Sequence, residues 1–536
     1  METPSWPERD SDHLLVTGTQ MAALEQQLFA SGLPVEALME KAALAVAQRL
    51  MRPDWWPHFQ RHGALVLVGP GHNGGDGLVV ARELHLAGIA VRIWSPFEHH
   101  KPLTAAHLRH ASWLRIPQQS AEPDPADPAI WIDALFGIGQ TRPLGPPLDS
   151  LLTARRQRQP AALVAVDVPS GLDDRSGQPL GLAWAQATRT YTIGLIKQGL
   201  VQDPALAAAG RVQRVELGLT PSLLAQLDPA TPLGLAEADA RLAPQPELNP
   251  AAGKYARGRL LVIAGSQAYR GAGHLALLGA SAAGPGSLLA AVAAPLAEAL
   301  WQLLPHVVLQ RQLACNPDGA LLLGDLEATD LARRDAVLLG PGLGPLAPDN
   351  GPGPQAEAER LAWERLQAFA GLLVLDADGL NRIGVPWLQG RRGPTWITPH
   401  RGELARLWPD LAELPALDAA RRAAADSGAV VLLKGARSVI ATPSGRCWQL
   451  LEAAAAAARA GLGDVLAGYA AARGAMALAA GHSGDGVWLA AAALDHAAAG
   501  LHCARERGPG GVSPGAVAAA LMRPNSESTH SINTRQ

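Results

Sequence analysis

The sequence predicts an α/β protein of two domains. Along most of its 536 residues, short apolar runs alternate with segments of helical periodicity, which is the pattern of parallel strands joined by crossover helices. The alternation stops in a stretch rich in Pro, Ala and Asp, residues 219–247, and then restarts. A chain of this length is also too long for a single hydrophobic core. We therefore predict a Rossmann-like αβα sandwich over residues 12–225 and a second α/β domain over residues 240–525.

The first domain is organised around the stretch 64–83, ALVLVGPGHNGGDGLVVARE. Its apolar run 64–68 predicts a buried parallel strand, residues 69–77 a glycine-rich loop, and the apolar spacing from Leu78 a helix. Such a loop lets backbone N–H groups approach a phosphate, and the helix adds a positive partial charge. Asp76 would repel phosphate and suits ribose hydroxyls, a cation or proton transfer. The alternative is that the glycines only let the helix pack tightly.

The other elements of the first half follow in order. We expect residues 1–12 to be disordered and residues 117–128 to form a surface loop. Helices are predicted over residues 19–30, 35–50 and 103–114, and further strands over residues 89–94, 129–134, 161–166, 188–194 and 212–217.

Six polar side chains follow strand ends in this half. Parallel strands bring their carboxyl ends to one edge of the sheet, where ligands bind. Three carboxylates with amide and hydroxyl oxygens suit a hard cation, and a carboxylate with a lysine can move a proton. For any single aspartate the alternative is a helix cap or a turn, but six such positions together favour a site. The six are Asn73, Asp76, Asp133, Asp167, Ser170 and Lys197.

Four motifs of this half, GPGHNGGDGLVVAREL, WIDALFGIG, VAVDVPSGLD and TIGLIKQGL, resemble the NAD(P)H-hydrate epimerase domain over residues 12–220. That family interconverts the R and S forms of hydrated NADH and NADPH. The resemblance implies a potassium ion held by Asn73, Asp133 and Ser170, with Lys197 near the site. Asp167 and Asp76 are the acid–base candidates, and the sequence does not choose between them. The implied substrate-binding residues are His72, where the family often has Asn, and Asn73, Gly74, Gly75, Asp76, Gly137, Ile138, Gly139, Gln140, Thr141, Arg142, Pro143 and Asp167.

The second half repeats the alternation without a GxxxxGK(S/T) loop, so it is not a P-loop NTPase. Backbone N–H groups of residues 461–463 at a helix start would form an anion hole, and Asp464 could accept a proton from a substrate hydroxyl. The alternative for Asp464 is a helix N-cap. Strands are predicted over residues 258–264, 288–292, 335–339, 371–375, 395–398 and 429–433, and helices over residues 271–283 and from residue 463.

Six motifs of the second half, KYARGRLLVIAGS, LLGPGLG, LDADGLN, ITPHRGELARL, VLLKGARSVIATPSG and GLGDVLAG, are similar to the ADP-dependent NAD(P)H-hydrate dehydratase, a ribokinase-like fold. The resemblance implies removal of water from the S form, driven by ADP or ATP with Mg²⁺, with Asp464 as the base in a phosphoryl transfer. The implied nucleotide-binding residues are Lys434, Gly435, Ala436, Arg437, Ser438 and residues 454–463, which include Gly461, Leu462 and Gly463. The implied contacts to the hydrate are Ala272, Gly342, His400, Arg401, Gly402, Glu403, Leu404, Ala405, Arg406 and Asp464.

One segment departs from this family. Where the family has a loop containing Gly and Asn before the GxGD motif, this chain has six alanines, residues 453–458. Alanine favours helix, so the segment puts nucleotide affinity or preference in question.

Composition indicates which partners and which cellular compartment suit the protein. The net charge of −3 gives no sign of nucleic-acid binding, and three cysteines far apart in sequence fit a reducing cytoplasm. The N-terminus lacks the regions of a signal peptide. The uncharged run 275–297 is long enough to span a bilayer, but Gly284, Pro285 and Pro295 interrupt it, which predicts a helix and a strand instead. We expect a disordered tail over residues 524–536 and, because family members oligomerise, a homo-oligomer.

Two other functions fit parts of the pattern. A small-molecule kinase of the ribokinase-like class with an unrelated partner domain would phosphorylate an alcohol with ATP. A nucleotide-sensing or scaffold module would need no proton-moving carboxylates, and the set of Asn73, Asp133, Asp167 and Ser170 speaks against it.

Overall fold

The structure, a computed structural model, describes residues 6–247, 250–251, 253–345, 353–453 and 455–522. The chain forms two compact units, one of residues 9–233 and one that combines residues 234–536 with residues 1–8. We describe each unit by itself. In the part of the chain that the structure describes, no helix is long and apolar enough to cross a membrane.

The first unit is built on a seven-stranded sheet in the order β4-β3-β2-β5-β6-β7-β9, and every pair of neighbouring strands is parallel. This confirms the predicted parallel α/β sheet. The strand order reverses between β2 and β5, which is the switch point where such sheets bind ligands. The strands are β2 (Ala64–Val68), β3 (Val91–Trp94), β4 (Gln118–Gln119), β5 (Ile130–Ala134), β6 (Leu163–Val166), β7 (Arg189–Ile193) and β9 (Arg211–Val215).

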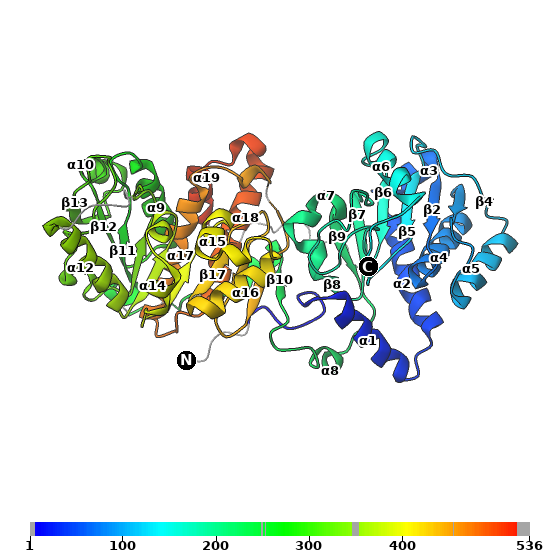
Figure 1. Ribbon diagram of the computed structural model, residues 1–536, viewed down its shortest axis with the longest axis horizontal. Helices are drawn as coiled ribbons and strands as arrows, with labels where there is room; N and C mark the ends of the chain where they lie inside the picture. Colours follow the sequence, from blue (N-terminus) through cyan, green and yellow to red (C-terminus); the bar gives the residue numbers. More distant parts are fainter. Residues whose placement is uncertain (1–5, 248–249, 252, 346–352, 454, 523–536) are drawn as a thin grey trace. The chain divides into compact units, whose positions relative to one another are not determined.

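A second, two-stranded sheet pairs β1 (Leu15–Val16) with β8 (Ile196–Lys197) in parallel. Helices cover the seven-stranded sheet (Figure 1). The helices are α1 (Gly18–Ala30), α2 (Val35–Leu50), α3 (Trp56–His62), α4 (His72–Leu86), α5 (Pro102–Trp113), α6 (Leu148–Arg158), η1 (Gln198–Val201), η2 (Asp203–Ala205), α7 (Leu206–Ala209) and α8 (Pro221–Leu224).

The predicted glycine loop is wrong beyond its first residues, because α4 already begins at His72. The glycines are needed for close packing within the first turns of this helix. A Cβ on Gly74 would lie 2.1 Å from the carbonyl oxygen of Gly69, and one on Gly77 would lie 2.3 Å from the Cβ of Ala134. The helix therefore sits against the end of β2 as closely as backbone permits, which is the alternative that the sequence left open.

The prediction of disorder over residues 1–12 is also wrong for the residues that the structure describes. Trp6 is buried, and its carbonyl accepts a hydrogen bond from Nε1 of the fully buried Trp448 at 3.3 Å. Arg9 donates to the carbonyls of Asp228 and Pro229, each at 3.0 Å. Residues 1–5 and the predicted disordered tail 524–536 lie outside the described residues.

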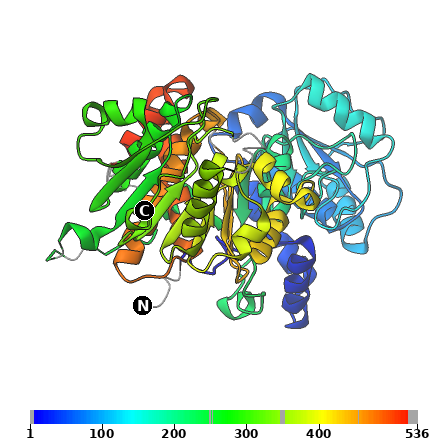
Figure 2. The same cartoon turned by 60° about the vertical axis from the view of Figure 1, so that its left-hand side comes forward.

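The second unit is built on a ten-stranded sheet in the order β10-β19-β18-β17-β16-β15-β14-β11-β12-β13. Figure 2 shows the green strands of this sheet running side by side. The strands from β13 to β17 are parallel, and β17, β18 and β19 are antiparallel. The sheet is thus mixed. Its strands are β10 (Leu233–Leu235), β11 (Arg259–Ile263), β12 (Ser287–Ala293), β13 (Val308–Leu313), β14 (Ala336–Leu339), β15 (Leu372–Leu375), β16 (Thr395–Ile397), β17 (Val430–Leu433), β18 (Val439–Ala441) and β19 (Cys447–Leu450).

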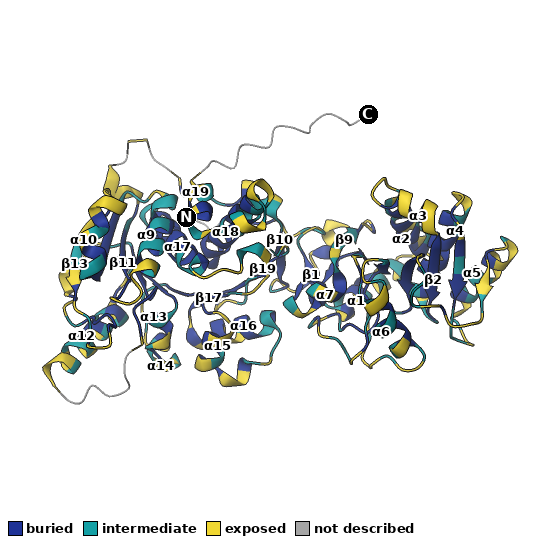
Figure 3. Ribbon diagram, turned by 90° about the horizontal axis from the view of Figure 1, so that it is seen from above, coloured by how far each residue is buried: buried dark blue, intermediate teal, exposed yellow. Residues whose placement is uncertain are grey.

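Helices lie on both faces of this sheet, with α9, α17 and α18 on one face and α12, α15 and α16 on the other (Figure 3). The uncharged run 275–297 divides between α9, β12 and the start of α10, as its glycine and prolines predict. The helices are η3 (Glu237–Arg241), η4 (Lys254–Arg257), α9 (Arg270–Ala283), α10 (Ala294–Leu303), α11 (Ala328–Leu331), α12 (Pro354–Ala368), α13 (Asp378–Asn381), α14 (Val385–Gln389), α15 (Arg401–Leu407), η5 (Pro409–Leu411), α16 (Ala416–Ser427), η6 (Ala455–Ala457), α17 (Leu462–Ala479), α18 (Gly486–Arg507), η7 (Pro509–Gly511) and α19 (Pro514–Leu521).

Candidate active sites

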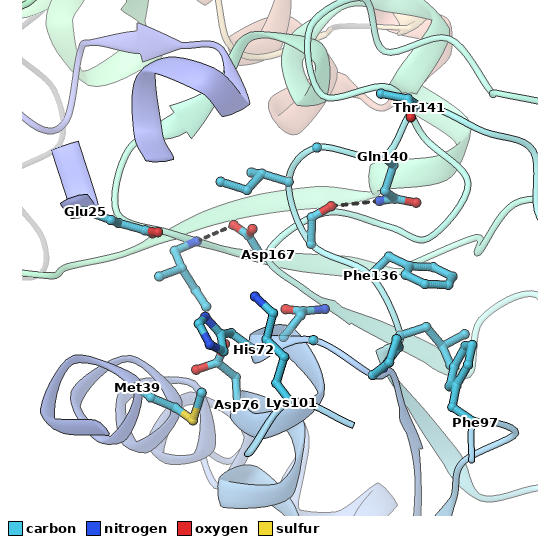
Figure 4. A pocket seen from close by; sticks show the side chains of 18 of the residues that line it. Glu25, Met39, His72, Asp76, Phe97, Lys101, Phe136, Gln140, Thr141 and Asp167 are labelled. Atoms are coloured by element: carbon cyan, nitrogen blue, oxygen red, sulfur yellow. Dashed lines mark hydrogen bonds between the residues drawn. The ribbon is translucent and has the colours of Figure 1, made fainter. Parts of the chain in front are cut away.

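A cavity of about 670 Å³ opens at the switch point of the first unit. Its walls come from α1, α2, the start of α4, and the chain that follows β5 and β6 (Figure 4). Gly74 and Gly75 pack behind it, where a Cβ on Gly75 would lie 2.6 Å from the Met39 side chain. The predicted site residues that line it are His72, Asn73, Asp76, Gly137, Ile138, Gly139, Gln140, Thr141, Arg142, Pro143 and Asp167.

Asp167 presents its carboxylate to the cavity from a left-handed backbone conformation, φ +66°. Its Oδ1 accepts a hydrogen bond from Nζ of Lys197 at 2.5 Å and from the amide of Ile193 at 3.1 Å. The Lys197 side chain is only 1% exposed, and Lys197 is not among the residues that line the cavity. Lys197 therefore acts on the cavity indirectly, by forming an ion pair with Asp167.

Two further carboxyl groups gather at this end of the cavity (Figure 4). Burial raises the pKa of Asp76 well above its ordinary value, and the charges of Asp167 and Glu25 add to the shift. Burial and the charge of Asp167 also raise the pKa of Glu25. Both groups therefore hold a proton to higher pH than an exposed carboxyl does. Sequence reasoning missed Glu25, and the one available signal was that it is the only charged residue in α1.

Of the three predicted cation ligands, Asn73 lines this cavity, and Asp133 and Ser170 contact each other behind it. Asp133 is fully buried, its Oδ1 accepts from Oγ of Ser170 at 2.7 Å, and its Oδ2 accepts from the Ser170 amide at 2.8 Å. Burial raises the pKa of Asp133 to about 6, although these hydrogen bonds oppose the shift. The side-chain oxygen and nitrogen of Asn73 are buried, and neither has a hydrogen-bond partner. A buried amide without a hydrogen-bond partner costs free energy, so the Asn73 side chain is suited to binding a ligand.

The opposite end of the cavity is aromatic (Figure 4). Phe97 and Phe136 meet edge to face, with ring centroids 5.9 Å apart. This arrangement provides an apolar surface on which a planar ring can pack.

In the second unit, charged groups from neighbouring strand ends converge on the start of α17. Nζ of Lys434 lies 2.7 Å from Oδ1 of Asp376 and 3.8 Å from Oε2 of Glu403. Burial lowers the pKa of Lys434, but these two carboxylates outweigh it and the net shift is upward. A Cβ on Gly463 would lie 3.7 Å from this ammonium, so Lys434 faces the helix N-terminus.

Asp464 lies in the first turn of α17, after Gly461 in the left-handed region at φ +89°. Burial raises the pKa of Asp464 to about 7, and the charges of Asp376 and Asp378 add to the shift while Lys434 opposes it. A carboxyl with such a pKa is poised to exchange a proton near neutral pH. No Asp464 side-chain cap was found on this helix, which argues against the N-cap alternative.

The predicted hydrate-binding segment forms α15, capped by Nδ1 of His400, which accepts from the Gly402 amide at 3.0 Å. The side chain of Leu404, another predicted contact, is fully buried in the core, so only its backbone is left to meet a substrate. The helical periodicity places it on the inner face of α15. Arg401 donates to the carbonyl of Leu414, and Arg406 to that of Leu380. Elsewhere, a Cβ on Gly342 would lie 2.8 Å from Cβ of Ala272, so these two predicted contacts are neighbours.

The predicted nucleotide-binding residues lie in two places. Lys434 to Ser438 form the connection from β17 to β18, where the Gly435 amide donates to Oγ of Ser438 at 3.4 Å. Ala454 lies outside the described residues, and the alanines that follow it form the short helix η6. Ala456 and Ala457 pack against the apolar cluster of Leu462, Ala499, Cys503, Val512, Ala516 and Val517.

These two sites define a class of protein, a two-unit α/β enzyme in which each unit gathers a lysine and carboxylates at the ends of its parallel strands. Proteins named bifunctional NAD(P)H-hydrate repair enzyme resemble it over most of their length. That of Gloeobacter violaceus is 43% identical, and the match covers 85% of this chain and 87% of the relative. The enzyme of Synechocystis sp. is 41% identical, and the match covers 85% of this chain and 84% of the relative. The enzyme of Mycobacterium tuberculosis is 34% identical, and the match covers 83% of this chain and 86% of the relative. The chain belongs to the family of bifunctional NAD(P)H-hydrate repair enzymes.

Family models match the two halves of the chain separately. Residues 35–199 match the family described as YjeF-related protein N-terminus, and residues 260–523 match NAD(P)H-hydrate dehydratase. The ADP/ATP-dependent NAD(P)H-hydrate dehydratase of Bacillus subtilis, co-crystallised with ATP/Mg²⁺, is 26% identical with a TM-score of 0.42 and covers 53% of this chain and 94% of its own. A ribokinase-like superfamily protein of Enterococcus faecalis is 21% identical with a TM-score of 0.44, over 54% and 93%. The family resemblance predicted from the sequence motifs is thus confirmed.

Proposed function

We propose that this protein repairs hydrated NADH and NADPH with two activities. The first unit interconverts the R and S forms, and the second removes water from the S form at the expense of ADP or ATP. One observation carries the proposal: each unit holds a carboxyl of raised pKa, the buried Asp76 in the first and the half-buried Asp464 in the second, beside a lysine–carboxylate pair. Both activities need a group that can hold or move a proton beside fixed charge.

Epimerisation requires that the hydrated ring carbon lose and regain its configuration. Water adds to the ring double bond at the carbon next to nitrogen, because that nitrogen stabilises positive charge there. Asp76 can hold the proton that such a step moves, and Asp167, paired with Lys197, supplies a negative charge that favours the cationic ring. The aromatic pair Phe97–Phe136 at the far end suits the second ring of a dinucleotide.

Potassium and magnesium are part of the proposal. Asn73, Asp133 and Ser170 would hold potassium, and the unpaired Asn73 amide supports this assignment. The ion would supply positive charge beside the buried Asp133. In the second unit, Mg²⁺ would neutralise phosphate charge.

Dehydration in the second unit would proceed through a phosphate ester. Asp464 accepts the proton of the hydrate's hydroxyl as that oxygen takes the terminal phosphoryl group of the nucleotide. The C–O bond then breaks, inorganic phosphate leaves, and the neighbouring carbon gives up a proton to restore the ring double bond. The free N–H groups at the start of α17 and the ammonium of Lys434 attract the phosphates.

An absorbance assay of NADH recovery from a mixture of hydrate epimers tests the proposal, with ADP, ATP or neither. We expect full recovery with nucleotide and none without it. Asp464→Asn should abolish recovery and leave epimer exchange intact, and Asp167→Asn should leave only the S form convertible. Phosphorylation of an unrelated alcohol with no effect on the hydrate would favour a small-molecule kinase instead. We also propose a homo-oligomer, which light scattering would test.

A further inference from the structure

Glu25 lines the cavity of the first unit, but it lies outside the sequence motifs that carry the family resemblance. It comes from α1, whereas Asp76 comes from α4, and both line the same end of the cavity (Figure 4). Within the part of the chain that the structure describes, neither side chain makes a hydrogen bond or a salt bridge. Two carboxyl groups therefore face the cavity with no protein partner.

A purely structural role does not account for Glu25. Glu25 is half-buried, and taking a carboxyl partly out of water without a partner costs free energy. The charge of Asp167 adds to that cost, while Lys197 offsets part of it. The neighbouring residues of α1, Met21 and Leu24, are buried and apolar, so glutamine or an apolar residue would suit the fold better at position 25. Such a costly group at a cavity wall is typical of a functional site.

Charged groups around Glu25 affect the protonation of the carboxyls at this end of the cavity. The facing groups are Asp76 from α4, Asp167 after β6, and Lys197 from β8. Lys197 pairs the charge of Asp167. Glu25 and Asp76 repel each other when both are ionised, so the charge of Glu25 helps to raise the pKa of Asp76.

We propose that Glu25 is a catalytic residue that exchanges a proton with the hydroxyl of the hydrated ring, in partnership with Asp76 on the other wall. This inference rests on the proposed epimerase function and assigns its second acid–base group. The carboxyl of Glu25 protonates the hydroxyl, the C–O bond breaks to release water, and the ring nitrogen's electron pair forms a C=N⁺ bond. Water then adds to the other face and gives its proton to ionised Asp76. The reverse reaction, or exchange with solvent, returns that proton to Glu25.

The test compares Glu25→Gln with Glu36→Gln in the full-length protein. Glu36 is an exposed carboxyl of α2 that does not line the cavity, so it is the matched control. Epimer exchange of hydrated NADH is followed by NMR, with kcat and KM measured separately. We expect Glu25→Gln to lower kcat for exchange by at least about 100-fold, with KM within about twofold. ADP-dependent recovery from the pure S form and the thermal midpoint should be unchanged, and Glu36→Gln should match the parent.

Chemical rescue separates catalysis from structure. Glu25→Ala opens space for a small acid, so formate should restore part of the exchange rate in this variant and have no effect on Glu36→Ala. Exchange by Glu25→Gln within threefold of the parent overturns the inference, as does a loss that formate does not rescue and that accompanies a lower thermal midpoint. Absence of exchange in the parent protein would instead overturn the proposed function itself.

Discussion

The proposed role of Asp464 as a base predicts that the rate of dehydration depends on pH. Because burial raises the pKa of Asp464 to about 7, a base at this position is mostly protonated at pH 6 and mostly ionised at pH 8. The ionised fraction rises about tenfold over this range, so kcat/KM for the S form should rise about tenfold. Initial rates of NADH recovery across the range check this. Asp464→Asn should give a low rate that does not change with pH, and a rate that falls with rising pH would contradict the role as base.

Asn73 should make the first unit sensitive to potassium. A ligand that binds only the folded state adds about 1.4 kcal/mol to the free energy of unfolding at ten times its Kd. We expect KCl to raise the thermal midpoint of the parent protein above its value in choline chloride of equal ionic strength. Asn73→Leu, which keeps the size but removes the amide, should abolish this difference. A shift that persists in the variant would place the cation elsewhere.

At the scale of single residues, position at a strand end was the useful signal. Asp167 follows β6 and Lys197 lies in β8, and their ion pair follows from the meeting of strand ends at one edge of a parallel sheet. Glu25 could not be found in this way. It lies in the middle of a helix, where a glutamate is usually exposed, and only the folded chain brings it to the cavity.

Gly74 determines how closely α4 approaches β2. A methyl group on Gly74 would lie 2.1 Å from the backbone oxygen of Gly69, and backbone cannot move aside as a flexible side chain can. Gly74→Ala should therefore lower the free energy of unfolding of the first unit by about 3 kcal/mol. Gly145→Ala is the control, since nothing lies within 4 Å of its added methyl, and it should stay within about 0.5 kcal/mol. Urea unfolding measures both, and equal effects would contradict the packing argument.

At the scale of elements, the buried parallel strands could be predicted from their apolar sequence, whereas strands of mixed polar and apolar composition and very short strands could not. β2 and β15 are continuous apolar runs because helices cover both faces. β13 carries Gln310 and Arg311 at an edge of the sheet, so its composition resembles a loop. The helical start of α4 was missed because glycine has a low helix propensity, which close packing overrides here.

Trp6 should stabilise the second unit although it precedes the first in sequence. Trp6 is 7% exposed, and its carbonyl accepts a hydrogen bond from Nε1 of the buried Trp448. Removing a buried tryptophan costs about 3 kcal/mol or more, so Trp6→Ala should make residues 234–536 open at lower urea concentration and leave residues 9–233 unchanged. Limited proteolysis with mass spectrometry identifies which unit opens. Trp113→Ala, at a site 75% exposed in the first unit, should change neither, and selective loss of the first unit in Trp6→Ala would contradict the assignment.

Residues 6–8 belong with residues 234–536, and this has a consequence for synthesis on the ribosome. The first unit emerges complete while its neighbour still consists of a short leading peptide, so it can fold first. The second unit must then recover a segment that left the exit tunnel more than two hundred residues earlier. A gene cut between the units would therefore yield one self-sufficient product and one that lacks its own beginning.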